Sequence, residues 1–227
     1  MTESSSPTLA RRVTGVLRIL FGLMVFSMVV WQITDRLVHN VFRPAEYFSY
    51  FTVQTCLGIA VLFVTAGIYS WSHAQDTRLL TIVRVSIFAY AIVMLVVYNV
   101  LLRDVAPAAA DVGYAWPVFP NEFEHVWAPI LVAVDWLFAP GRFPLRIRAM
   151  WWALLYPLAW VAFSLVRGAL TGWWPYPFLD PNGPNGVVGV VVYVVGIAGF
   201  MAFNAFVAVF IGWVWTRRRR TEAARSS

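Results

Sequence analysis

The sequence predicts an all-α integral membrane protein, a bundle of six transmembrane helices with its N- and C-termini in the cytoplasm. Hydrophobic residues make up 60% of the chain, charged residues make up 12%, and the mean hydropathy is +0.70. This composition is typical of a protein whose surroundings are largely lipid, and it argues against a soluble domain. The apolar residues form separate stretches, and the arginines are concentrated in alternate connecting segments.

Six stretches are apolar and long enough for a helix that crosses about 30 Å of hydrocarbon, which takes about 20 residues. They comprise residues 13–34, 50–71, 79–102, 122–139, 149–170 and 187–215, of which the fourth is short. Polar residues directly follow the first stretch, without a small-residue cleavage site, so it is predicted to be a retained helix and not a signal peptide. The predicted organisation is a cytoplasmic tail over residues 1–12, a transmembrane domain over 13–215 and a basic cytoplasmic tail over 216–227.

The 17 basic residues are all arginines, and they predict the orientation of the bundle. Basic residues near the ends of spans are retained on the cytoplasmic side. Most of them lie in the two tails and in the second and fourth connections, and the other side holds only Arg36, Arg43, Arg103 and Arg167. Both termini are therefore predicted to be cytoplasmic, in a multi-pass protein of the bacterial inner (plasma) membrane. The arginine run 217–220 directly follows a span, which favours an anchor to anionic lipids over a nucleic-acid site.

Several chemistries are not indicated. The single cysteine, Cys56, excludes an internal disulfide and a cysteine-rich metal site. A haem held within a bundle needs opposed histidines inside the spans, but neither His39 nor His73 lies within a clear span. HExxH, P-loop, GxGxxG and GxSxG patterns do not occur. The sequence therefore predicts no metal and no cofactor.

The second predicted span begins with hydroxyl groups, in the stretch 46-EYFSYFTVQT-55. At 100° per residue, Ser49, Thr52, Thr55 and Cys56 share one face of a helix. In one interpretation the hydroxyls only bond carbonyls one turn back or join neighbouring helices, which is a common use of Ser and Thr in membranes. In the other interpretation they form one wall of a site.

The fourth predicted span begins with 120-PNEFEHVWAP-129. Asn121 and Glu124 have the spacing of a capping box, so Asn121 is predicted to be the N-cap. Pro129 follows His125 by four residues, and its ring is expected to displace the carbonyl of His125 and to kink the helix. An ionisable residue just inside a membrane helix is a functional candidate, although a histidine at the interface also serves simply to bond water or headgroups.

Thr52 and His125 both lie about one turn inside the outer surface of the predicted bundle, so they are expected to meet. A threonine hydroxyl is a weak nucleophile unless a neighbouring base removes its proton, and imidazole is suited to that role at neutral pH. Together the two residues are the minimum needed to hydrolyse an ester that enters from the lipid.

Three stretches carry a family resemblance: FSYFTVQT, the histidine followed four residues later by proline in a span that ends in DW, and YPLAWVAFSLVRGALTGWWPYPFLDP. Over about residues 12–215 the chain resembles the prokaryotic six-transmembrane proteins. These are related to the eukaryotic androgen-induced membrane proteins, which are threonine hydrolases of fatty acid esters of hydroxy fatty acids. The resemblance implies that Thr52 in SYFTVQT is the catalytic threonine and that His125 in HVWAP is the catalytic histidine.

Other polar residues are candidates for substrate binding or support. Asp135 lies ten residues beyond His125, some 15 Å deeper, so it is expected either to make a structural bond or to serve function, but not to orient His125 directly. Asn99 is a candidate donor to an oxyanion or a helix cap. The segment 167–186 is either an interfacial loop held by its aromatic rings or a lid over the Thr52 and His125 pocket. The candidate binding residues are Ser49, Thr55, Asn99, Asp135, Arg167, Tyr176 and Asp180, with Arg167 expected to pair with Asp180 or with a substrate carboxylate.

Three classes of function remain open. The main prediction is an intramembrane hydrolase of lipid esters, of the type formed by a fatty acid with a hydroxy fatty acid. The alternatives are a non-catalytic membrane protein that binds or transports lipids or small molecules, and a structural membrane protein. A transporter usually shows an internal repeat or helices broken near the midplane, whereas here only Pro157 interrupts the fifth span. The predicted partners are membrane lipids and a lipid ester, and not nucleic acid.

Overall fold

The computed structural model describes residues 6–103, 105 and 111–225, and this part of the chain is helical, without a strand. The α-helices are α1 (Leu9–Val38), α2 (Pro44–Tyr47), α3 (Phe51–Ser72), α4 (Arg78–Val97), α5 (Val118–Glu122), α6 (Ala128–Phe138), α7 (Trp152–Thr171) and α8 (Gly186–Arg225). Shorter helical turns are η1 (Tyr98–Leu102), η3 (Phe123–Trp127), η4 (Ile147–Trp151) and η5 (Pro177–Leu179).

Five helices are long and apolar enough to cross a membrane: Leu9–Val38, Phe51–Ser72, Arg78–Leu102, Ile147–Thr171 and Gly186–Trp215. They coincide, to within a few residues at most ends, with five of the six predicted spans. Large apolar side chains on α7 and α8, such as Leu155, Leu170 and Val188, are exposed. A surface of this kind is stable against lipid but not against water, so the fold is that of a helical membrane protein.

The fourth predicted span, 122–139, differs from the others because it consists of three consecutive pieces, α5, η3 and α6. Pro129 has no N–H to give to the carbonyl of His125. The N–H of Ala128 bonds the carbonyl of Phe123, five residues back, and this bond forms the π-helical turn η3. The predicted capping box is wrong, because the helix begins one turn earlier, at Val118, and Asn121 lies inside α5.

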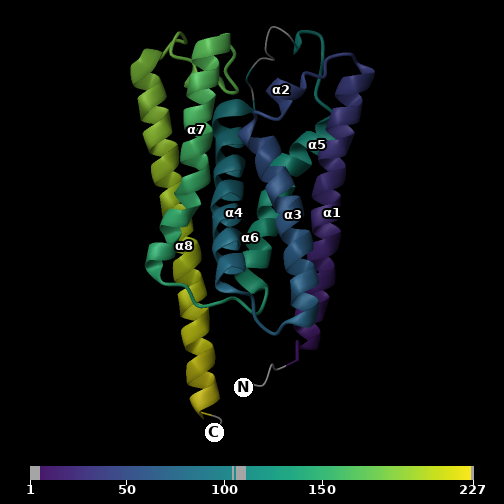
Figure 1. Cartoon of the computed structure of the whole chain (residues 1–227), viewed down its shortest axis with the longest axis vertical. Coiled ribbons are helices and arrows are strands. Elements are labelled where there is room, and N and C mark those ends of the chain that lie inside the picture. Colours follow the sequence, from purple (N-terminus) through teal and green to yellow (C-terminus); the bar gives the residue numbers. More distant parts are fainter. Residues whose placement is uncertain (1–5, 104, 106–110, 226–227) are drawn as a thin grey trace.

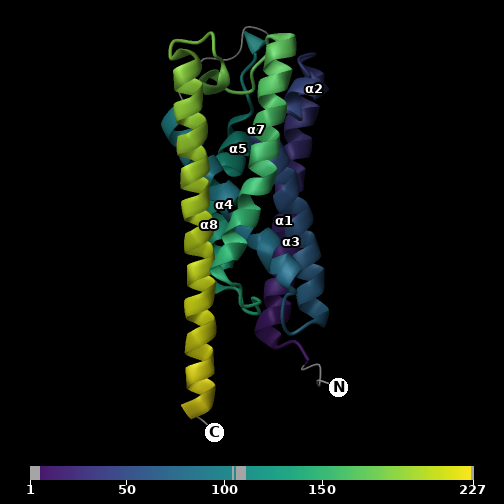
Figure 2. The same ribbon diagram turned by 60° about the vertical axis from the view of Figure 1, so that its left-hand side comes forward.

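The long helices lie along one axis, with α4 in contact with α3 and α6 on one side and with α7 and α8 on the other (Figure 1). The start of α1 and the end of α8 lie at the same end of the molecule, which we call the terminal end. The opposite end, called the distal end, carries α2 and the connection between α7 and α8. Seen from the second direction, α8 extends beyond the other helices at the terminal end (Figure 2).

Helices α1 and α3 pack closely because glycines face each other. A Cβ on Gly67 would lie 2.6 Å from the carbonyl oxygen of Gly15, and a Cβ on Gly22 would lie 2.8 Å from the carbonyl oxygen of Ala60. Small residues of this kind let the backbones of membrane helices approach each other. The contact holds α1 against the helix that carries Thr52.

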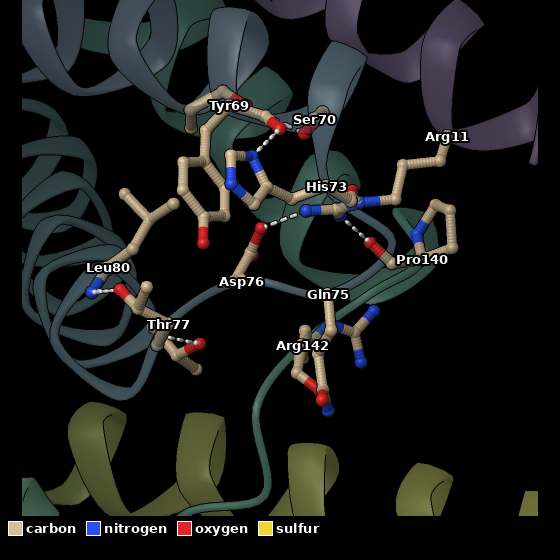
Figure 3. A network of polar contacts seen from close by, with 12 residues as sticks. Arg11, Tyr69, Ser70, His73, Gln75, Asp76, Thr77, Leu80, Pro140 and Arg142 are labelled. Carbon is tan, nitrogen blue, oxygen red and sulfur yellow. Dashed lines mark hydrogen bonds and ion pairs between the residues drawn. The ribbon is translucent and has the colours of Figure 1, made fainter. Parts of the chain in front are cut away.

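A buried ion network joins the helices near the terminal end. The Asp76 carboxylate pairs with Arg11 and Arg84, at 2.5 Å in each case, and Asp135 pairs with Arg18 and Arg84, at 2.7 Å in each case. Figure 3 shows the Arg11 side of this network, where the guanidinium also donates to the carbonyl oxygens of His73 and Pro140. The carboxyl group of Asp135 thus makes a structural bond between α1, α4 and α6.

Candidate functional site

The larger cavity described here has a volume of about 690 Å³, and its lining includes the connection between α7 and α8, which lies at the distal end. Its lining includes polar side chains from α1, α3, the two π-helical turns and the connection between α7 and α8, among them Gln32, Thr52, Tyr98, Glu124, His125 and Tyr176. Residues far apart in the sequence therefore converge on one polar space.

A second cavity of about 70 Å³ is lined mainly by apolar side chains of α4, α7 and α8, such as Met94, Leu158 and Ile197. Some residues line both cavities, and they are Thr52, Tyr98, Leu102, His125 and Tyr176. The predicted pair, Thr52 and His125, therefore lies at the junction between a polar space and an apolar one.

Thr52 lies in the first turn of α3, where backbone N–H groups have no acceptor within the helix. Tyr50, the N-cap residue, provides no side-chain bond. The N–H of Thr52 instead donates to the hydroxyl oxygen of Tyr176, over 3.3 Å, and the Thr52 and Tyr176 hydroxyls lie 3.4 Å apart. Burial raises the pKa of Tyr176, so its hydroxyl stays protonated and can donate a hydrogen bond of its own.

His125 is held by two neighbours. Its Nδ1 lies 2.8 Å from the carbonyl oxygen of Asn121, and its ring stacks on that of Tyr98 with 4.0 Å between the centroids. A carbonyl only accepts, so we assign the proton of the neutral imidazole to Nδ1, which leaves a lone pair on Nε2. The side-chain amide of Asn121 donates to the Tyr98 hydroxyl over 2.8 Å, so one residue positions both rings. This tautomer is the one that a general base needs.

The two π-helical turns, η1 and η3, carry the stacked rings of Tyr98 and His125. Such turns are rare and occur frequently at functional sites. The proline four residues after His125 was the sequence signal for η3. No comparable signal precedes η1, where the N–H of Arg103 bonds the carbonyl of Tyr98.

Ser49 and Thr55 lie in the core and do not line either cavity. The Ser49 hydroxyl donates to the carbonyl oxygen of Ala45, and its own carbonyl accepts the indole N–H of Trp160. Thr55 is buried, and its hydroxyl has no hydrogen-bond partner in the described part of the chain. For Ser49 the structure favours the simpler of the two interpretations, in which hydroxyls bond carbonyls one turn back.

Asn99 and Asp135 also lie outside the two cavities. Asn99 is exposed, donates to the carbonyl oxygen of Leu95 and accepts from Arg103, so it is not placed to stabilise an oxyanion beside Thr52. Asp135 belongs to the ion network near the terminal end. For Asp135 the structure therefore favours the structural bond, one of the two predicted alternatives, and it places neither residue in the lining of the two cavities.

The connection between α7 and α8 lines the larger cavity through Trp173, Trp174, Tyr176 and Asp180. The predicted pair of Arg167 and Asp180 is not among the ion pairs of the described residues. The guanidinium of Arg167 lies over the ring of Trp173, 4.2 Å from its centroid, whereas Asp180 accepts the backbone N–H of Asn182. Arg167 is not among the residues that line the larger cavity.

Sequence reasoning did not predict that Glu124, Gln32 and Tyr98 line the larger cavity. Glu124 was interpreted as half of a capping box, but it is a buried residue of the cavity lining, as is Gln32. The available signal was an acidic residue within an otherwise apolar span, because such residues are expensive in a membrane and mark functional sites.

The described residues contain no group of three or more His, Cys, Asp or Glu side chains that could hold a metal ion. In comparisons with known proteins, no family model, no curated protein and no solved structure matches the chain. Any functional conclusion therefore depends on the geometry of the two cavities.

Proposed function

We propose that the protein is an intramembrane hydrolase of lipid esters, with Thr52 as the nucleophile and His125 as the base. The supporting observation is that both side chains line the polar cavity and the apolar cavity at once. An ester bond in a lipid also lies between a polar head and an apolar chain. The cavity of about 70 Å³ has room only for the part of the chain next to the ester, and a lipid held in this way would bring its ester to these two residues.

The proposal includes the orientation of the protein. The five long helices and the segment α5–η3–α6 make six spans, and the arginine distribution gives cytoplasmic termini, in a bacterial inner membrane. The distal end then faces outward, and the active site lies within the outer leaflet.

In the proposed reaction, Nε2 of His125 takes the proton of the Thr52 hydroxyl while Oγ1 attacks the ester carbonyl carbon. The negative charge that develops on the carbonyl oxygen accepts a hydrogen bond from the Tyr176 hydroxyl. The tetrahedral intermediate collapses as His125 returns the proton to the leaving alcohol, which leaves an acyl group on Thr52. Water, deprotonated by His125, then releases the fatty acid and restores the threonine hydroxyl.

A lipid-binding or transport function is the second candidate, and one observation favours it. The structure records a hydrogen bond between Thr52 and Tyr176 but none between Thr52 and His125 among its described contacts. Catalytic hydrogen bonds are often long or poorly aligned before substrate binds, so the hydrolase proposal places the bond between Thr52 and His125 in the complex with substrate.

The deciding experiment measures ester hydrolysis by the purified protein in detergent, with long-chain p-nitrophenyl esters and esters of hydroxy fatty acids. Thr52→Val and His125→Gln are each expected to lower kcat by at least about 10²-fold, because each removes a group that acts on the reacting atoms. The matched controls are Thr65→Val, which alters an exposed threonine of the same helix, and His39→Gln, which alters an exposed histidine. An inactive wild type, or variants as active as the wild type, would favour the lipid-binding function.

A further inference from the structure

Glu124 and Gln32 form a polar pair in the wall of the larger cavity, with 1% of each residue exposed. The Gln32 amide lies within reach of a long, weak hydrogen bond to the Glu124 carboxyl, but neither Gln32 Nε2 nor Glu124 Oε1 has a partner at normal hydrogen-bond geometry in the described part of the protein. The other end of the amide is occupied, because Gln32 Oε1 accepts from the Tyr47 hydroxyl over 3.1 Å. One donor and one acceptor therefore remain free at the cavity wall.

A buried polar atom without a partner costs free energy, so an unmatched donor and acceptor side by side are retained for a reason. The ion network at the terminal end shows the contrast, since each of its carboxylates is paired with two arginines. In the cavity wall, a ligand is the partner that would complete the pair.

The chemistry of the pair selects the ligand group. A hydroxyl both donates and accepts, so it matches Glu124 Oε1 and Gln32 Nε2 together. An ammonium group has no acceptor and would leave Gln32 Nε2 unmatched. A carboxylate would place its oxygens against the acceptor Glu124 Oε1, and Asp180 also lies in the lining, whereas Asp111 is already paired with Arg36 and Arg43. Arg103, the basic residue in the lining, is already paired with Glu122 at 2.9 Å.

We propose that Glu124 and Gln32 bind a hydroxyl group on the head of the lipid and so determine specificity for lipids with a hydroxylated head. The binding of a hydroxyl group does not depend on hydrolysis. The inference rests on the proposed function only where it treats the bound lipid as an ester substrate. In that case its preferred alcohol is a polyol such as glycerol, and not a hydroxy fatty acid, whose free carboxylate has no hydrogen to donate to Glu124 Oε1.

Binding of uncleavable ethers tests the site without relying on catalysis. The probes are 1-O-oleylglycerol, which carries two hydroxyls, and methyl oleyl ether, which carries none. The wild type in detergent is expected to bind the glycerol ether about 10-fold more tightly or better, the gain expected of one or two added hydrogen bonds. Glu124→Met and Gln32→Met should each remove most of this preference, whereas Glu46→Gln, outside the cavity lining, should retain it. Two variants at the site keep the test decisive where one fails to fold.

A wild type without preference for the glycerol ether, or variants that keep the full preference, would overturn the proposal. A preference that Glu124→Met and Gln32→Met abolish would support it even where the protein hydrolyses no ester, in which case the hydrolase proposal fails alone. The opposite case is that the protein is a hydrolase but lacks the specificity site. Rates of hydrolysis of oleoylglycerol, methyl oleate and an oleoyl hydroxy fatty acid identify that case. Equal rates on all three, unchanged in Glu124→Met, would leave the hydrolase standing and refute the specificity site.

Discussion

Tyr176 comes from a connection 124 residues beyond Thr52, yet its hydroxyl bonds the backbone of that residue. In the first turn of α3 this hydroxyl takes the place of a helix cap. Because it accepts from an N–H, its own hydrogen is available to Thr52 or to a bound ester. The role of Tyr176 in the proposed reaction follows from this geometry.

At the residue scale, we predict that Tyr176→Phe lowers kcat for ester hydrolysis by about 10²-fold with little change in KM. The reason is that a donor to the oxyanion acts mainly in the transition state. Steady-state kinetics with a p-nitrophenyl ester measures the effect, and Tyr193→Phe, at a half-buried tyrosine of α8, is the control. An unchanged kcat would remove Tyr176 from the mechanism.

The raised pKa of Tyr176 predicts that the contribution of its hydroxyl to kcat does not change with pH below that pKa. Burial favours the neutral form, so the donor hydroxyl is present at every pH below the raised pKa, which lies above the ordinary value of about 10. The ratio of kcat between the wild type and Tyr176→Phe should therefore stay constant from about pH 7 to about pH 10. A ratio that falls steadily toward 1 across this range would contradict the assignment.

At the scale of the helices, backbone contact between α1 and α3 sets the position of the wall that carries Thr52. The glycines at 15, 22 and 67 lie where a side chain would meet the facing helix. Their spacing alone does not identify them, because a methyl group added at Gly196 or Gly199 on α8 would have no neighbouring atom within 4 Å. Only the facing helix distinguishes a packing glycine from an exposed one.

We predict that Gly67→Ala destabilises the protein by about 1–3 kcal/mol, because the added methyl group would overpack the contact with the Gly15 carbonyl. The matched control, Gly196→Ala, should be neutral or slightly stabilising, since alanine favours the helix and the site is open. Thermal unfolding in detergent compares the two variants. Equal midpoints would show that the close approach of α1 and α3 contributes nothing.

At the scale of the whole molecule, the two ends have different chemistry. The terminal end is closed by paired charges from α1, α4, α6 and the connection after α3. The distal end contains the larger cavity, where two polar side-chain atoms, Gln32 Nε2 and Glu124 Oε1, lack a partner among the described residues. Rigid pairing at one end and unmatched polar groups at the other fit a protein that admits a ligand from the distal end.

We predict that Asp135→Asn destabilises the protein by about 3–5 kcal/mol, because it leaves the buried Arg18 without its paired carboxylate and leaves Arg84 paired with Asp76 alone. Glu122→Gln, which removes the more exposed pair with Arg103, should cost less than about 1 kcal/mol. Denaturant or thermal unfolding of the purified variants measures both. A small effect at Asp135 would mean that the network does not hold the helices together.

The proposed orientation is tested by labelling with a membrane-impermeant maleimide. In a Cys56→Ala background, Val112→Cys at the exposed distal end is expected to react in intact cells. Ser6→Cys, just before α1, is expected to react only after the membrane is permeabilised. The reverse pattern would invert the topology and place the larger cavity on the cytoplasmic side.

The sequence by itself determined the class of the protein and where five long helices lie, because the hydropathy and length of a segment are local properties. It also indicated Thr52 and His125 as candidate site residues at a similar depth in the membrane, since depth along a helix follows from position in the chain. The three-piece form of the segment from α5 to α6 was only partly predictable, through Pro129. The proline accounts for η3, but where the helix begins depends on residues upstream of Asn121.

Only the tertiary structure decided which neighbour each polar side chain has. Asp135 and Asn99 were both candidates for a supporting role in the site. In the structure, Asp135 belongs to the ion network and Asn99 is exposed. Tyr176 reaches Thr52, and Gln32 lies beside Glu124, through contacts between segments distant in the chain. Such pairings depend on how each helix is rotated and packed against its neighbours, and hydropathy along a single chain carries no record of that rotation.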